Sequence, residues 1–164
     1  DYLLGEEGKG CVQVMQGFDF SRSLIGLQCL GTARQSLDET WAYAGERRAF
    51  GKPLASFQGV AHQLADFDTK VEAARLMSMN ALWLKDRGLP HTAEAAMTKW
   101  WPPLLAYEAI HACLLIHGHA GYADALPFQQ RLRDVLGLQI GDGTAHIMKN
   151  IIARERAGRD AVSG

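Results

Sequence analysis

The tetrapeptide Gly141-Asp142-Gly143-Thr144 combines the residue types that a positioned acid or base requires. Glycines on both sides allow the backbone to bring the Asp142 carboxylate close to a bound molecule, and Thr144 is a natural N-cap for the helical pattern that follows. Asp-Gly is also one of the commonest turn dipeptides. Local sequence alone therefore favours either a general base or an ordinary turn that begins a helix.

Two further segments could contact an anionic ligand. The first, residues 46–58, places Arg47 at an expected helix end beside Gly51 and Lys52, and a guanidinium there offers a fork of donors to phosphate oxygens. The second, residues 116–122, contains Gly118 and Gly121, which allow backbone amides to approach a phosphate or a flavin closely. Each segment also has a purely structural interpretation. Residues 46–58 would be a basic cluster that stabilises a helix C-terminus, and residues 116–122 would be a helix stop.

A group of histidines and a cysteine near the second segment invites a metal interpretation. Its members are His111, Cys113, His117 and His119. At 100° per residue only Cys113 and His117 share a helix face, and Gly118 ends the helix before His119 could join them. We therefore predict that this group holds no metal.

Helices with apolar residues at steps of three and four must position these segments. The three long apolar faces are Leu30, Ala33, Leu37, Trp41 and Ala44; Leu64, Phe67, Val71, Ala74, Met77, Ala81 and Leu84; and Leu105, Ala109, Ala112 and Ile116. A fourth helix is expected from about Thr144, with Ile147 and Ile151 one turn apart. Pro102 and Pro103 should kink or split the third helix, and we expect a bend there. Short glycine-containing connections then predict an all-α, antiparallel four-helix bundle.

Composition narrows the function classes. The chain has 164 residues and a net charge of -1, and its charges are mixed along the sequence, which indicates one main domain and no nucleic-acid or membrane partner. No leader and no apolar stretch of ~20 residues is recognisable, so we expect a cytoplasmic protein.

Residues 1–10 are expected to be a connector and residues 11–164 the bundle. Cys11, Cys29 and Cys113 stand among apolar neighbours and are expected to be reduced and buried.

In this order, the segments resemble the C-terminal domain of the acyl-CoA dehydrogenases, flavoproteins that desaturate acyl-CoA thioesters. The resemblance covers nearly the whole chain, from Leu3-Leu4-Gly5 to the Asp142 turn, and the Arg47 to Gln58 block is its most specific part. It implies a four-helix bundle, FAD as cofactor, an acyl-CoA substrate, an electron-transfer flavoprotein as acceptor and a homo-oligomer. Residues 1–10 would then connect the bundle to a preceding β domain.

The resemblance also implies roles for individual residues. Arg47, Phe50, Gln58 and Gly118 would contact the FAD of a neighbouring subunit, Thr144 and His146 the FAD of their own subunit, and Asp19, Arg22, Gly141 and Gly143 the substrate. Asp142 falls where the family has its catalytic base, which is usually Glu. Some relatives carry the base at the position of Ser21 instead, where this chain has no carboxylate.

Departures from the family pattern bear on the substrate and on the cofactor contacts. Ala49, Leu115 and His119 replace polar or glycine residues that often contact FAD. Gly141 stands where relatives often carry an aromatic residue, and a short Asp base with an open neighbour suits a wide alicyclic substrate such as cyclohexanecarboxyl-CoA. Two alternatives stay open: a nitroalkane oxidase-like flavoprotein, which also uses Asp as base, and a non-catalytic helical interaction module.

Overall fold

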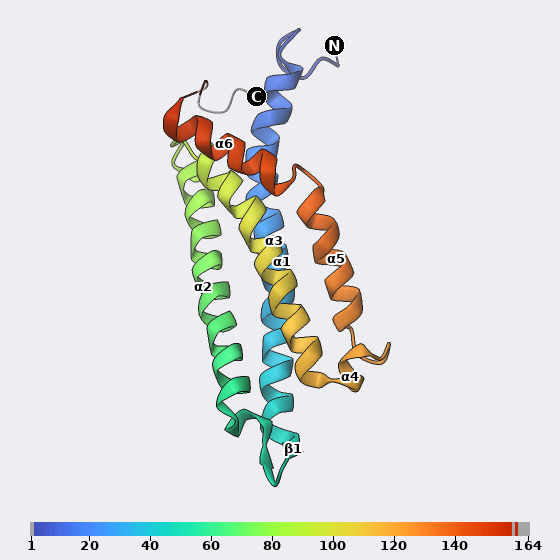
Figure 1. Ribbon diagram of the computed structural model, residues 1–164. Coiled ribbons are helices and arrows are strands. Elements are labelled where there is room, and N and C mark those ends of the chain that lie inside the picture. Colours follow the sequence, from blue (N-terminus) through green and yellow to red (C-terminus); the bar gives the residue numbers. More distant parts are fainter. Residues whose placement is uncertain (1, 159, 161–164) are drawn as a thin grey trace.

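The computed structural model describes residues 2–158 and residue 160, and most of this part of the chain is helical (Figure 1). The elements, in chain order, are α1 (Gly10–Glu46), β1 (Arg48–Ala49), β2 (Lys52–Pro53), the 3-10 turn η1 (Leu54–Ser56), α2 (Gln58–Asp86), α3 (Thr92–His117), α4 (His119–Tyr122), α5 (Phe128–Ile140) and α6 (Ala145–Ala157). Residues 2–9 carry no helix or strand. The division into a connector over 1–10 and a bundle over 11–164 stays a prediction.

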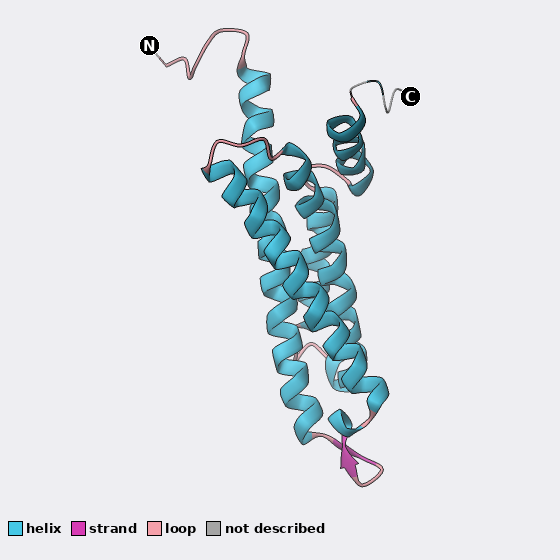
Figure 2. Cartoon of the chain, turned by 90° about the vertical axis from the view of Figure 1, so that its left-hand side faces the viewer, coloured by secondary structure: helices cyan, strands magenta, loops and turns pink. Residues whose placement is uncertain are grey.

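Four antiparallel helices, α1, α2, α3 and α5, form the bundle, and α6 crosses its end (Figure 1). The all-α bundle is confirmed, but the expected fourth helix was the wrong one. The helix after Thr144 is α6, which packs mainly on α3, whereas the fourth bundle helix is α5. β1 and β2, each two residues long, pair as an antiparallel hairpin at the end of the bundle opposite to α6 (Figure 2).

The core is built from the predicted apolar faces. Leu37, Leu64 and Leu105 are 0 to 1% exposed and lie in one cluster with Phe128 and Val135 of α5. The last helix forms from Thr144 as expected, but it buries a different residue from the two isoleucines. Ile147 is 51% exposed, and Met148 is the fully buried residue of α6. Because α6 crosses the bundle end, the buried face of this helix is set by its angle to α3 rather than by its sequence period alone.

The expected split of the third helix does not occur. α3 runs unbroken through Pro102 and Pro103, and both prolines are buried. Pro102 has no N–H for the carbonyl oxygen of Thr98, four residues earlier. That oxygen faces α1, where a Cβ added to Gly26 would lie 2.6 Å from it. The prolines therefore lie where α1 and α3 approach most closely at Gly26, and a bend within the unbroken helix stays a prediction.

Gly26 and Gly31 give a matched pair of α1 glycines with opposite expected effects. Gly26→Ala should destabilise the protein by ~1 to 3 kcal/mol, because its methyl group would overlap the Thr98 carbonyl oxygen. A methyl group added at Gly31 has no atom within 4 Å. Gly31→Ala should therefore stabilise the protein by ~0.5 to 1 kcal/mol, because alanine loses less backbone entropy than glycine when a helix forms. Urea unfolding followed by circular dichroism measures both. Equal effects would contradict the close approach.

The cysteines differ from one another. All three are free, and Cys29 and Cys113 are buried as predicted. Burial raises the pKa of each of these two thiols to about 11, so both are protonated at neutral pH. Cys11 is exposed, contrary to prediction, because residues 10–17 of α1 project beyond the other helices.

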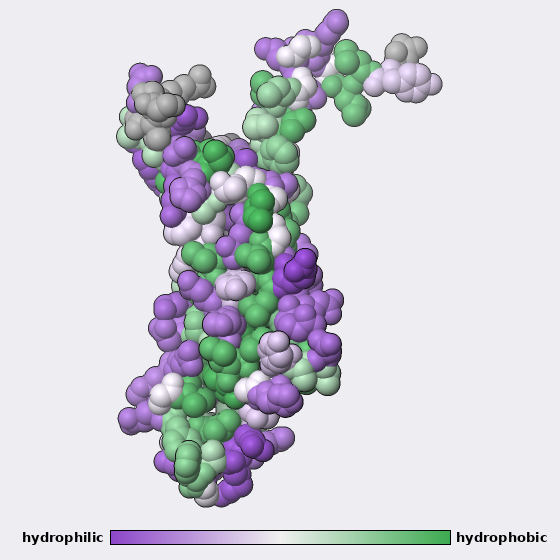
Figure 3. Space-filling view, turned by 45° about the vertical axis from the view of Figure 1, so that its right-hand side comes forward, coloured by the Kyte–Doolittle hydropathy of each residue, from purple (hydrophilic) through white to green (hydrophobic). Residues whose placement is uncertain are grey.

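The projecting part of the chain carries exposed apolar side chains (Figure 3). Leu4 is 87% exposed, and Val12, Val14 and Met15 are each about half exposed. Among the described residues, no helix combines the length and the apolar character that crossing a membrane requires.

Candidate functional site

The Asp142 turn joins α5 to α6 in a conformation that few residues adopt. Asp142 has φ 58° and Gly143 has φ 111°, so two consecutive residues are in the left-handed region. Gly143 is favoured there because a residue with a Cβ is strained at φ 111°; the Cε of Met148, 2.6 Å from an added Cβ, is the flexible end of its side chain. Thr144 occupies the N-cap position of α6 as predicted, but its hydroxyl makes no capping hydrogen bond.

Helix α1 contacts the Asp142 turn at two points. The Ser21 hydroxyl donates a hydrogen bond of 3.1 Å to Oδ2 of Asp142, and Nε of Arg22 donates one of 3.4 Å to the Asp142 carbonyl oxygen. Asp142 is exposed, whereas Arg22 is 6% exposed. The carboxylate is thus accessible to a ligand while its backbone is held from the buried side. The position of Ser21, where some relatives carry their base, lies directly beside this carboxylate.

Asp19 and Arg22, the predicted substrate contacts, pair with each other, and Asp19 has both carboxylate oxygens occupied. Nη1 of Arg22 lies 3.1 Å from Oδ1, and the Thr92 hydroxyl donates a 2.8 Å hydrogen bond to Oδ2. The Asp19 carboxylate therefore orients Arg22 and ties α1 to the start of α3. Opposite charges at an i, i+3 spacing were the sequence signal for this pair, but nothing local indicated Thr92.

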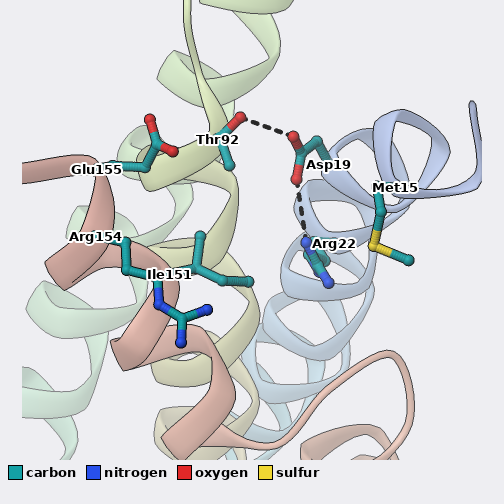
Figure 4. A pocket seen from close by; sticks show the side chains of 7 residues that line it. All are labelled: Met15, Asp19, Arg22, Thr92, Ile151, Arg154 and Glu155. Atoms are coloured by element: carbon teal, nitrogen blue, oxygen red, sulfur yellow. Dashed lines mark hydrogen bonds and ion pairs between the residues drawn. The ribbon is translucent and has the colours of Figure 1, made fainter. Parts of the chain in front are cut away.

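A hollow of about 480 Å³ opens beside these residues, between α1, the start of α3 and α6 (Figure 4). Its lining consists of Met15, Asp19, Arg22, Thr92, Ile151, Arg154 and Glu155. Arg154 lies in the last turn of α6, where a cation also interacts favourably with the helix dipole. Its position facing Arg22 across the hollow depends on the angle of α6. The hollow thus offers two arginines beside two carboxylates and an apolar wall, so an anionic ligand with an apolar part would have to lie against the arginines.

The other predicted ligand contacts lie at the far end of the bundle. Arg47 follows α1, Phe50 is 97% exposed at φ 51° in the hairpin, and Gln58 begins α2. Gly118, at φ 61°, ends α3 at the same end of the bundle. A rise of ~1.5 Å per residue along α1 separates Arg22 from Arg47 by roughly 38 Å. Thr144 and His146 lie at the Asp142 end, so the predicted cofactor residues form two separate groups.

The histidine at the end of α3 serves the core. The His117 ring stacks on Tyr43 with centroids 4.1 Å apart, and its Nδ1 lies 2.9 Å from the Cys113 carbonyl oxygen. Cys113 and His117 share a face, as expected. Within residues 2–158 and 160, no group of three or more His, Cys, Asp or Glu residues is arranged to hold a metal ion.

Residues 8–156 match the family model described as acyl-CoA dehydrogenase, C-terminal domain. The chain belongs to this family. It is 37% identical over 153 residues to cyclohexane-1-carbonyl-CoA dehydrogenase of Geobacter metallireducens, covering 93% of this chain and 40% of that relative. Membership in the acyl-CoA dehydrogenase family confirms the resemblance drawn from the Arg47 to Gln58 block and the Asp142 turn.

Solved structures agree with this fold. Butyryl-CoA dehydrogenase from Megasphaera elsdenii superposes with a TM-score of 0.90 at 33% identity, over 93% of this chain and 40% of that one. PigA, solved with FAD and proline, superposes with a TM-score of 0.91 at 28% identity, over 95% of this chain and 41% of that one. The chain therefore spans about two fifths of the length of these proteins.

Proposed function

We propose that this chain is the C-terminal domain of an FAD-dependent acyl-CoA dehydrogenase in which Asp142 is the catalytic base. One observation carries the proposal. The Ser21 hydroxyl holds the exposed Asp142 carboxylate, Arg22 holds the Asp142 carbonyl oxygen, and Arg22 also lines the hollow between α1 and α6. A base, a cation and an apolar wall thus converge where a thioester could lie.

In this mechanism Asp142 takes the proton from the carbon α to the thioester carbonyl. The chemistry that bound FAD would supply is acceptance of the β hydrogen with its electron pair, which would leave a double bond between the two carbons. Arg22 and Arg154 would hold anionic groups of the CoA part. Ser21, which donates to Oδ2, would leave the other carboxylate oxygen available to the proton.

The residues present fit an FAD shared between two copies of the chain. Exposed Arg47 offers donors to a pyrophosphate at one end, and the unpaired amides at the start of α6, beside Thr144, suit polar acceptors at the other. The groups lie too far apart for one dinucleotide to contact both. A homo-oligomer in which Arg47, Phe50, Gln58 and Gly118 reach a neighbour's cofactor accounts for this separation, and an electron-transfer flavoprotein is the proposed acceptor.

Flavin content and substrate-dependent bleaching test the function. The purified full-length protein should contain FAD, and its flavin absorbance should fall under anaerobic conditions on addition of an acyl-CoA. Nitroalkanes should leave the absorbance unchanged. Bleaching by a nitroalkane alone would favour a nitroalkane oxidase-like enzyme, and protein without flavin that cannot be reconstituted would favour a non-catalytic interaction module.

Arg47→Ala should weaken FAD retention by the full-length protein. Loss of a charge-assisted contact to a pyrophosphate costs ~1.5 to 3 kcal/mol, or roughly 10- to 100-fold in affinity. Arg87→Ala is the control, because Arg87 lies over the Trp83 ring and outside both proposed cofactor groups. Flavin absorbance per protein after dialysis measures retention. Equal flavin content in the two variants would remove Arg47 from the cofactor site.

We further propose an alicyclic acyl-CoA as the substrate. Gly141 is exposed at φ −57°, and an added Cβ would meet only the Gly137 carbonyl oxygen at 3.7 Å, so the backbone does not require glycine there. The glycine instead leaves room beside the base. A relative named cyclohexane-1-carbonyl-CoA dehydrogenase supports this substrate class.

Gly141→Tyr tests the substrate class without disturbing the turn. The ring should lower kcat/KM for cyclohexanecarboxyl-CoA by ~10-fold or more, since it occupies space beside the base, and should leave butyryl-CoA turnover within about 2-fold. Steady-state assays of the full-length enzyme with both substrates measure the ratio. Parallel changes for the two substrates would contradict the role of Gly141.

A further inference from the structure

Lys99 lies inside the bundle, where lysine is rarely found. It stands in the middle of α3 and is 1% exposed. Lysine is almost never fully buried unless it is paired, because removing an ammonium group from water is costly. Such a residue requires a compensating set of contacts, and its position indicates what those contacts serve.

The Lys99 ammonium bridges the two sides of the Asp142 turn. Its Nζ donates hydrogen bonds of 2.8 Å to the carbonyl oxygen of Leu138 and of 3.1 Å to that of Gly143. Leu138 lies in the last turn of α5, where carbonyls lack partners within the helix. A cation at this helix end is also stabilised by the helix dipole. One side chain therefore joins the end of α5 to the residue that follows Asp142.

The turn has an uncommon backbone conformation. Asp142 lies in the left-handed region at φ 58°, which aspartate tolerates better than most residues other than glycine, so the fixed geometry of the turn depends on the contacts that hold it. Burial lowers the pKa of Lys99, while the negative charge of Asp142 opposes this effect and the positive charge of Arg22 adds to it. Arg22 and Ser21 hold Asp142 from α1, and Lys99 holds the turn from α3.

We propose that Lys99 is the positioning residue of the base: its buried ammonium, bonded to Leu138 and Gly143, fixes the turn that presents Asp142. The proposal rests on the function proposed above for Asp142. It gives α3, which carries no residue of the predicted site, a defined part in the reaction. Lys99 itself touches neither substrate nor cofactor in this role.

Lys99→Met in the full-length flavoprotein tests the proposal. Methionine keeps an apolar stem of similar length but has no donor, so the turn loses both hydrogen bonds. Displacement of a catalytic group by ~1 Å can cost ~100-fold, and we expect kcat to fall by roughly 10- to 100-fold with KM and FAD content near the parent values. Lys149→Met is the control, since Lys149 is exposed on α6 over the Trp100 ring, and it should behave as the parent.

A double variant separates positioning from general structural damage. If Lys99 acts through Asp142, Lys99→Met should add little to the loss caused by Asp142→Asn, because no base remains to be positioned. If the fold losses in kcat of the two single variants multiplied in the double variant, the proposal would be overturned. Hydrogen exchange gives an independent readout: amides of residues 141–144 should exchange faster in Lys99→Met, while those of α1 and α2 should be unchanged.

The outcomes distinguish the two proposals. Near-parental turnover in Asp142→Asn would reject the function of Asp142, whatever Lys99→Met shows. An inactive Asp142→Asn together with parental kcat and exchange in Lys99→Met would reject only the role of Lys99. Lys99→Arg keeps the charge and donors and should recover part of the activity. Failure of both Lys99 variants to fold would assign Lys99 to global stability and overturn the positioning role.

Discussion

Asp142→Asn in the full-length enzyme is expected to lower kcat by at least ~100-fold while FAD stays bound. Asparagine tolerates the left-handed conformation of Asp142 at φ 58° and can still accept a hydrogen bond from Ser21, so the turn should survive. What is lost is the carboxylate that takes the α proton. Anaerobic flavin reduction by a saturating acyl-CoA measures this step directly.

The control for Asp142→Asn is the same chemical change at an exposed acid elsewhere. Asp38→Asn on α1 alters a solvent-exposed carboxylate and should leave turnover unchanged. Turnover of Asp142→Asn within about 2-fold of the parent would show that the Gly-Asp-Gly-Thr segment is only a turn with an N-cap. That outcome is the second interpretation that the local sequence allows.

Arg22→Met is expected to destabilise this chain by ~3 to 5 kcal/mol, as removal of one partner of a buried ion pair commonly does. The Arg22 and Asp19 side chains are only 8% and 15% exposed, so the Asp19 carboxylate would be left with the Thr92 hydroxyl alone. The Asp142 carbonyl oxygen would also lose its donor. Urea unfolding followed by circular dichroism measures the change.

Arg75→Met provides a matched comparison for Arg22→Met. Arg75 pairs with Glu72 at the same i, i+3 spacing and at 2.7 Å, but both side chains are nearly half exposed. Water and salt screen such a pair, so the variant should unfold at the parental urea concentration. Equal midpoints for Arg22→Met and Arg75→Met would mean that burial contributes nothing to the Asp19 pair.

Much of the fold could be predicted from local pattern because helix periodicity is a short-range property. The apolar faces that include Leu37, Leu64 and Leu105 became the core. Gly51, Gly88 and Gly118 all lie in the expected connections. The Arg47 to Gln58 block indicated the family that the comparison then showed. α5 was missed although its apolar residues Phe128, Leu132 and Val135 follow the i, i+4, i+7 spacing of a helix face and lie in or against the core.

Tertiary structure decided which of these residues meet. Ser21 and Asp142 are 121 positions apart, and no local spacing predicts their 3.1 Å hydrogen bond. The sequence likewise contained no signal that the Lys99 ammonium would reach Leu138 and Gly143. Propensity and periodicity act within a few turns of a helix, whereas the angle at which α6 crosses the bundle results from packing between distant segments. The sequence by itself thus determined the helices and a candidate base, and only packing determined what holds that base in place.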